Sequence, residues 1–235
     1  MPLYLAFLLF IALSGCAGQG IMRKDGVSSA RTFSAANLAK NDADMMAELN
    51  QREMLKSLKL LSEKLYRRNP QEYRKSGQES PAAASALIFE QIPKWGDPAI
   101  NPPDWRESFQ LAFLESYTGD RVLAFMTALT SMVMASYDYK SEFFLTDSLS
   151  AQKLYNSARN IEIAAWKLSN AKLPNGARVL ISNSMDGDIA NLSFEREFGK
   201  LIAQQDMLAL FIEDRSNRSI SRVFQNIATF AFLPI

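Results

Sequence analysis

Apolar residues recur at three- and four-residue steps along most of the chain, which is the spacing of one face of an α-helix. Each stripe buries one side of a helix and leaves the other side in water. Val179–Ile181 is the only strand-like run, and it is too short and too isolated to build a sheet. The stripes are Met54, Leu55, Leu58, Leu61 and Leu65; Leu154, Ala158, Ile161, Ala165 and Leu168; Phe194, Phe198, Leu201, Leu208, Phe211 and Ile212; and Ile220, Val223, Phe224, Ile227 and Phe230.

One segment, residues 122–135, is apolar on most faces, with only threonine and serine as interruptions. A helix that crosses a bilayer needs about 20 apolar residues, so this shorter run predicts a helix surrounded by other helices. The sequence therefore predicts an all-α fold of about seven helices, packed as an irregular bundle around a central apolar helix over residues 121–137.

Capping residues and breakers suggest where the helices begin and end. Prolines and small polar residues before an apolar stripe favour helix starts at Ser80, Asp104, Asp147 or Ser148, and Ser193. Asp186-Gly187-Asp188 suggests a calcium-binding loop, but the alignment places Ser182 and Ser193 at positions that require carboxylates. We therefore interpret residues 183–188 as a turn. The expected helices cover residues 43–68, 81–91, 104–117, 122–135, from 147 or 148 to 168, 193–215 and 220–230.

Residues 92–104 contain four prolines and Gly96, so they predict either a boundary between two lobes or an ordered surface loop. Trp95 lies in this loop and Trp105 follows it, while Tyr137 and Tyr139 leave the central helix. These four side chains are a candidate interaction surface, because large aromatic residues concentrate binding energy at interfaces. The alternative is that both tryptophans pin the loop to the core.

Residues 3–13 are an uncharged apolar run of the length of a signal-peptide core, and Cys16, the only cysteine, follows it closely. The motif Leu13-Ser14-Gly15-Cys16 resembles the lipobox of bacterial lipoproteins. Met1 and Pro2, which precede the apolar run, lack the lysine or arginine that is usual there. The resemblance implies cleavage before Cys16, a diacylglyceryl group on its thiol and an acyl group on the new α-amine. The alternative is an ordinary secretory signal with an incidental cysteine.

The expected organisation is a signal peptide over 1–15, a lipidated N-terminus and tether over 16–42, and a helical domain over 43–235. Ala17 follows the cysteine, where Gram-negative lipoproteins of the inner membrane tend to have aspartate. The resemblance therefore implies a lipid anchor at the periplasmic face of the outer membrane. A flexible tether of about 20 residues spans roughly 25 Å, which is enough to lift a domain off the headgroups.

Composition removes several classes of function. The chain has no histidine, so histidine bases, Ser-His-Asp triads and nearly all zinc sites are excluded. Its 26 lysine and arginine residues balance 25 aspartate and glutamate residues, which gives no indication of nucleic-acid binding. We expect no metal and no cofactor beyond the covalent lipid on Cys16.

Two further resemblances concern the helical domain. Arg67-Arg68-Asn69-Pro70, followed by another helical stretch, resembles one unit of a tetratricopeptide-type array, but no second copy follows at the required spacing. Glu107-Ser108 and Glu115-Ser116 resemble the opening of the lytic transglycosylase motif, whose downstream Gly-Leu-Met-Gln is absent.

The sequence thus predicts a non-catalytic adaptor or scaffold that binds the membrane through its lipid and an envelope protein through its helical domain. The first alternative is a carrier of an apolar ligand in a cavity lined by methionine and phenylalanine, because three methionines lie in the central helix. The second alternative is an enzyme that cleaves peptidoglycan.

Overall fold

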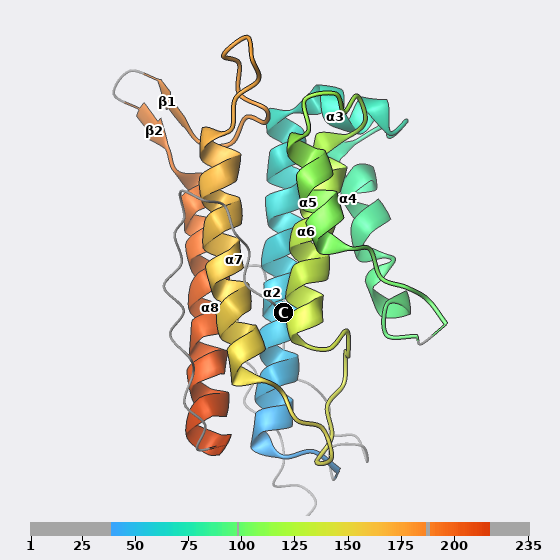
Figure 1. Ribbon diagram of the computed structural model, residues 1–235, viewed down its shortest axis with the longest axis vertical. Helices are drawn as coiled ribbons and strands as arrows, with labels where there is room; N and C mark the ends of the chain where they lie inside the picture. Colours follow the sequence, from blue (N-terminus) through green and yellow to red (C-terminus); the bar gives the residue numbers. More distant parts are fainter. Residues whose placement is uncertain (1–38, 98, 187–188, 217–235) are drawn as a thin grey trace, which may run out of the picture. The chain divides into compact units, whose positions relative to one another are not determined.

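The structure, a computed structural model, describes residues 39–97, 99–186 and 189–216, and those from Asn41 onward belong to one compact unit. The described residues form seven α-helices, one 3₁₀ turn and one small hairpin (Figure 1), so the fold is all-α as predicted. The elements are α2 (Asp42–Arg68), α3 (Pro70–Lys75), α4 (Pro81–Phe89), η2 (Ile92–Lys94), α5 (Trp105–Phe113), α6 (Arg121–Ser136), α7 (Ala151–Asn170), β1 (Ser184–Asp186), β2 (Ile189–Asn191) and α8 (Ser193–Ser216).

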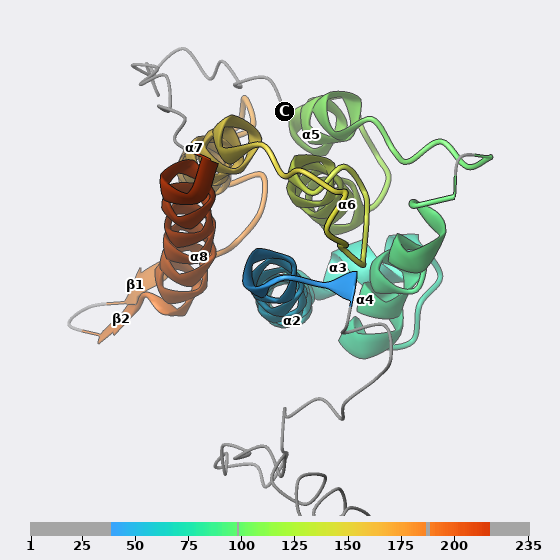
Figure 2. The same ribbon diagram turned by 90° about the horizontal axis from the view of Figure 1, so that it is seen from below.

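Two helices, α2 and α6, form the centre of the bundle. Figure 2 shows α2 between α8 on one side and α4 and α6 on the other, with α5 packed on α6 and α7 beside α8. The predicted central helix corresponds to α6, which is buried on most faces. Helix α2 shares the central position, because Ala47, Met54, Leu58, Leu61 and Leu65 are fully buried between these neighbours.

Side-chain caps fix most of the helix starts, as expected for Ser80 and Asp104, while Asn41 and Asp44 form a capping box at the start of α2. Helix α7 begins later than predicted, because Ser150, and neither Asp147 nor Ser148, accepts the hydrogen bond from the backbone of Lys153. Asp147 instead closes the preceding turn by accepting a hydrogen bond from the Phe144 amide at 3.0 Å.

The segment after α7 agrees with the expectation in one part and differs from it in another. Val179–Ile181 builds no sheet, as its short length suggested, and the Asn69 side chain satisfies both backbone groups of Ile181, at 2.8 Å and 2.9 Å. Ser184–Asp186, which falls in the predicted turn, is instead strand β1 and pairs antiparallel with β2. This two-stranded hairpin is a small addition beside a helical core.

The helices described here include none that is long and apolar enough to cross a membrane. The predicted helix over residues 220–230 lies outside the described residues, as does the predicted signal peptide.

A buried arginine ends helix α5 earlier than predicted, at Phe113, where the sequence suggested Tyr117. The Arg121 guanidinium donates hydrogen bonds to the carbonyls of Ala112, Leu114, Glu115 and Tyr117, at 2.7 to 3.1 Å. Carbonyls at a helix end lack partners within the helix, so Arg121 satisfies groups that would otherwise be unpaired. One side chain thereby fixes the connection between α5 and α6.

A second polar junction lies at the centre of four helices. The amide of Gln205 on α8 donates to Ser136 Oγ on α6 and to Ser157 Oγ on α7, both at 3.0 Å. Its Oε1 accepts a hydrogen bond from the Tyr137 hydroxyl at 3.1 Å, and Asn50 on α2 donates to the same hydroxyl at 3.0 Å. Because a buried polar network favours the one arrangement that satisfies all its members, it sets the register of α8 against its neighbours.

Replacement of Arg121 should test how much the junction between α5 and α6 contributes to stability. Arg121→Met leaves several carbonyls without a donor, so we expect a loss of about 3 kcal/mol in the free energy of unfolding, measured by urea denaturation. Arg67→Met is the matched control, because the Arg67 side chain is 66% exposed and its ion pair contributes about 0.5 kcal/mol or less. Equal midpoints for the two variants would contradict this role of Arg121.

Candidate binding sites

A groove of about 380 Å³ lies between the second half of α7 and the first half of α8. These two helices pack side by side (Figures 1 and 2), and the groove follows the line of their contact. Its lining residues are Glu162, Ala165, Trp166, Ser169 and Asn170 from α7, and Glu195, Phe198, Gly199 and Ile202 from α8.

The floor of the α7–α8 groove is apolar and its wall carries an accessible tryptophan. Phe198 and Ala165 are buried beneath it, while Trp166 is 40% exposed. A Cβ atom added at Gly199 would meet nothing within 4 Å, so the absence of a side chain there leaves open space. Glycine within a helix reduces its stability by about 1 kcal/mol relative to alanine, so this position opens the surface at the expense of helix stability.

The rim of the groove is acidic. Arg159 forms ion pairs with Glu162 at 3.1 Å and with Asp206 at 2.6 Å, while Glu195 accepts a hydrogen bond from the Asn183 amide at 2.7 Å. Burial raises the pKa of Glu162, and the negative charge of Asp206 adds to this effect while Arg159 opposes it. Arg159 thus pairs with two carboxylates, and the charged residues that line the groove, Glu162 and Glu195, are both acidic, so the rim favours a cationic ligand.

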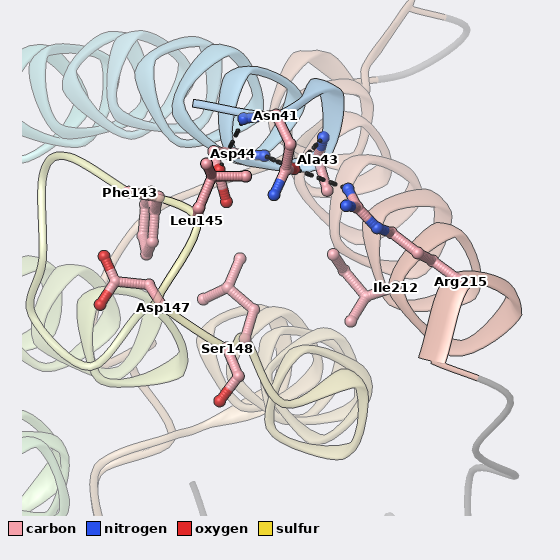
Figure 3. A pocket seen from close by; sticks show the side chains of 10 residues that line it. Asn41, Ala43, Asp44, Phe143, Leu145, Asp147, Ser148, Ile212 and Arg215 are labelled. Atoms are coloured by element: carbon pink, nitrogen blue, oxygen red, sulfur yellow. Dashed lines mark hydrogen bonds between the residues drawn. The ribbon is translucent and has the colours of Figure 1, made fainter. Parts of the chain in front are cut away.

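A second pocket, of about 220 Å³, lies where the start of α2, the loop before α7 and the end of α8 meet. Figure 3 shows Arg215 pointing toward Asn41 on one side, with Phe143 and Asp147 on the other. Arg215 donates to Asn41 Oδ1 at 2.6 Å, and Asn41 also caps α2. The hydrogen bond from Lys140 lowers the pKa of Asp147.

The polar groups of this second pocket therefore already serve the fold. Asp44 accepts a hydrogen bond from the backbone N–H of Asn41 at 2.8 Å, and Asp147 accepts one from the Lys140 ammonium group at 2.5 Å. We interpret the pocket as a structural junction between α2, the loop and α8.

The four aromatic residues proposed as an interaction surface do not form one. Trp95 and Trp105 are 7% and 5% exposed, and Tyr137 is fully buried. Tyr139 is half-buried, packs edge-on against Trp95 at 6.4 Å between ring centroids, and shares a hydrogen bond with Ser131. Their burial agrees with the alternative, in which the tryptophans pin the loop over 92–104 to the core.

The remaining sequence candidates are not brought together. Cys16 and the motif Leu13-Ser14-Gly15 lie outside the described residues. Glu107 and Glu115 are exposed and line neither pocket, and no residue of α6 lines either one. Within the described ranges, no group of three or more aspartate, glutamate or cysteine side chains could hold a metal ion.

Sequence reasoning missed the groove, although the stripes contained a signal. Trp166 immediately follows Ala165, and Gly199 immediately follows Phe198, so both residues lie at the edge of an apolar stripe. A glycine inside a helical pattern often has a packing or functional reason, so Gly199 was the available signal, whereas the sequence does not show that Trp166 is exposed.

Two carboxylates near the pockets should affect stability with opposite signs. The raised pKa of Glu162 means that its charged form opposes folding, so stability increases as the pH falls through this pKa. The lowered pKa of Asp147 means that its charged form favours folding, and this contribution is lost as the pH falls. At neutral pH we therefore expect Glu162→Gln to stabilise the protein and Asp147→Asn to destabilise it.

Both differences should shrink in acid, where wild type carries the neutral carboxyl as well. Urea denaturation between about pH 3 and about pH 8 would measure these differences in stability, because carboxyl groups titrate within this range. If both variants shifted the midpoint in the same direction at neutral pH, the assignment of the two environments would be wrong.

Comparison with known proteins does not connect the chain to a family. No family model matches it, and neither a curated protein nor a solved structure matches it. The function has to be inferred from the residues of the chain itself.

Proposed function

We propose that the protein is a lipid-anchored envelope protein that acts as a non-catalytic adaptor. Cys16 attaches it to the periplasmic face of the outer membrane through diacylglyceryl and N-acyl chains, and the helical domain binds a protein partner. The observation that carries the proposal is the apolar groove between α7 and α8, with Trp166 accessible on its wall.

The chemistry of the groove favours one kind of ligand, an amphipathic helix with basic residues on its flank. Helices α7 and α8 lie on either side of an apolar floor, and such a groove accepts the apolar face of a third helix. Binding of a helix in a groove is a common mode of peptide recognition. Gly199 allows close approach, Trp166 offers a large contact area, and the carboxylates of Glu162 and Glu195 attract cationic side chains.

The membrane anchor follows from the sequence motif. Two or three acyl chains on Cys16 give stable attachment, whereas a single chain binds only weakly and reversibly. Adaptor activity needs only such an anchor and a binding surface, so it requires none of the catalytic groups that the composition lacks.

The two alternatives receive no specific support. A carrier would need an apolar cavity beside the methionines of α6, and both pockets described above are lined by other elements. A peptidoglycan-cleaving enzyme would need its acid in a sugar cleft, whereas Glu107 and Glu115 are exposed outside both pockets.

Attachment through Cys16 predicts a change of cell fraction and of mass. Wild type should be recovered with membranes, and mass spectrometry should find the N-terminal peptide starting at Cys16 with its acyl chains. Cys16→Ala should remove both the processing and the membrane association. Recovery of Cys16→Ala with membranes at the wild-type level would contradict lipid anchoring.

Partner binding through the groove predicts a loss on truncation of Trp166. After mild crosslinking in its own membranes, Trp166→Ala should recover the partner about tenfold less well than wild type, because a central aromatic contact contributes about 1.4 kcal/mol or more. Leu60→Ala, at a 41% exposed apolar position on α2, is the matched control and should bind normally. Equal recovery with both variants would overturn the assignment of the groove.

A further inference from the structure

Helix α8 carries an exposed stripe that extends the groove toward the end of the helix. Gly199, Ala203, Met207 and Leu210 follow one another at steps of four, four and three residues, so they lie on one face. Met207 is 66% exposed and Leu210 is 50% exposed, which is high for large apolar side chains in one row. The row is a seam of the kind that a further helix covers.

The stripe begins with small residues and ends with a charge. Gly199 and Ala203 allow the backbone of a neighbouring helix to come close, and Ile202 and Trp166 flank them in the groove. Asp214 follows Leu210 by four residues and is exposed on the same face. A ligand of this face therefore needs an apolar stripe with a cation near one end.

Residues 217–235, which follow α8 directly and lie outside the described residues, have this pattern. Their sequence predicts an amphipathic helix with an apolar stripe, and Arg218 and Arg222 are at its start. The stripe consists of Ile220, Val223, Phe224, Ile227 and Phe230.

The length of this segment matches the length of the seam. From Gly199 to Ser216 the helix axis covers about 26 Å, at about 1.5 Å per residue. A helix over residues 220–232 covers about 18 Å, and three extended residues after it add about 10 Å. A segment that turned back at 217–219 would therefore reach the groove beside Trp166.

The charges match in the same arrangement. If Ile220 is level with Ser216 on an antiparallel neighbour, Arg222 is level with Asp214, and Arg218 lies in the turn beside it. The exposed Asp214 near the end of α8 would then face Arg222 at the start of the segment, whereas Arg215 in the same turn is bonded to Asn41. The opposite, parallel direction is excluded for a directly connected segment of this length.

We propose that residues 217–235 fold back antiparallel along α8 and occupy the α7–α8 groove of the same chain. The inference rests on the proposed function of the groove as a helix-binding surface, and it makes this segment the resident ligand that a partner helix displaces. A tethered ligand has an effective concentration on the order of millimolar, so a free partner binds more weakly while the segment is docked.

A disulfide between α8 and the segment would test this arrangement in the full chain. Cys16→Ala removes the only native cysteine, so the double substitution Ala203→Cys with Ala231→Cys leaves a single possible pair and keeps every large apolar anchor. Ala203 belongs to the exposed stripe of α8, and Ala231 follows Ile227 by four residues and so lies on the same face as the apolar stripe of the segment. A disulfide requires Cα atoms about 5.5 Å apart. Leu87→Cys on α4, across α2 from α8 in Figure 2, replaces Ala203→Cys in the control pair.

Under mild oxidation we expect the 203–231 pair to form an intramolecular disulfide at least tenfold faster than the 87–231 pair, at a rate independent of protein concentration. Equal rates would overturn the proposal. Disulfide-linked dimers from the 203–231 pair, at a rate that increases with concentration, would also overturn it and would identify a second copy as the occupant.

A blocking variant provides an independent readout. Gly199→Leu extends a side chain into the open space of the groove, so trypsin should cleave after Arg218 and Arg222 about tenfold faster than in wild type. Gly199→Ala is the matched control, because its single Cβ contacts nothing and leaves the groove open. If Gly199→Leu did not change the cleavage rate, the segment would not lie in the groove.

Different results would contradict the adaptor function of the groove and the docking of residues 217–235. A 203–231 disulfide together with partner recovery that is insensitive to Trp166→Ala would overturn the adaptor groove and retain the docked segment. Partner recovery that depends on Trp166, without a preferred disulfide, would overturn the docked segment alone.

Discussion

The amide of Gln205 makes the interaction on which the arrangement of the other helices depends. It lies fully buried on α8 and bonds to Ser136, Ser157 and Tyr137, while Asn50 of α2 bonds to the same tyrosine hydroxyl. Apolar contacts alone tolerate sliding and rotation of one helix on another, whereas a buried amide is satisfied in only one register. The network therefore fixes α8 against three helices at once, and with it the line along which α8 meets α7.

The groove is a consequence of that fixed line. Phe198 precedes Gln205 by seven residues and so lies on the same face of α8, toward the centre of the bundle. Gly199, the next residue, is turned toward the surface beside Trp166. The ion pair of Arg159 with Asp206 joins α7 to α8 further along the same contact, and Glu162 on α7 pairs with the same guanidinium. A rigid core thus presents an apolar surface with an acidic rim, which suits recognition of a basic amphipathic helix.

The parts of the fold that could be predicted depend on signals within a few residues, and the parts that could not depend on contacts between distant residues. Periodicity located the buried faces of α2, α7 and α8, and capping residues located the starts of α4 and α5, because these signals act within a few residues. The end of α5 depends on Arg121, and the position of the backbone at Ile181 depends on Asn69. Both side chains act on backbone groups outside their own helices, and no local pattern indicates such contacts.

By itself, the sequence determined the all-α class, the buried α6, the absence of histidine chemistry and the motif at Cys16, since each depends on composition or on neighbouring residues. Only the tertiary structure decided that Trp95, Trp105 and Tyr137 are buried while Trp166 is accessible. An aromatic residue beside an apolar stripe can face either the core or the solvent. Which of the two occurs depends on the rotation of one helix against another, and this rotation is set by contacts between residues far apart in the chain.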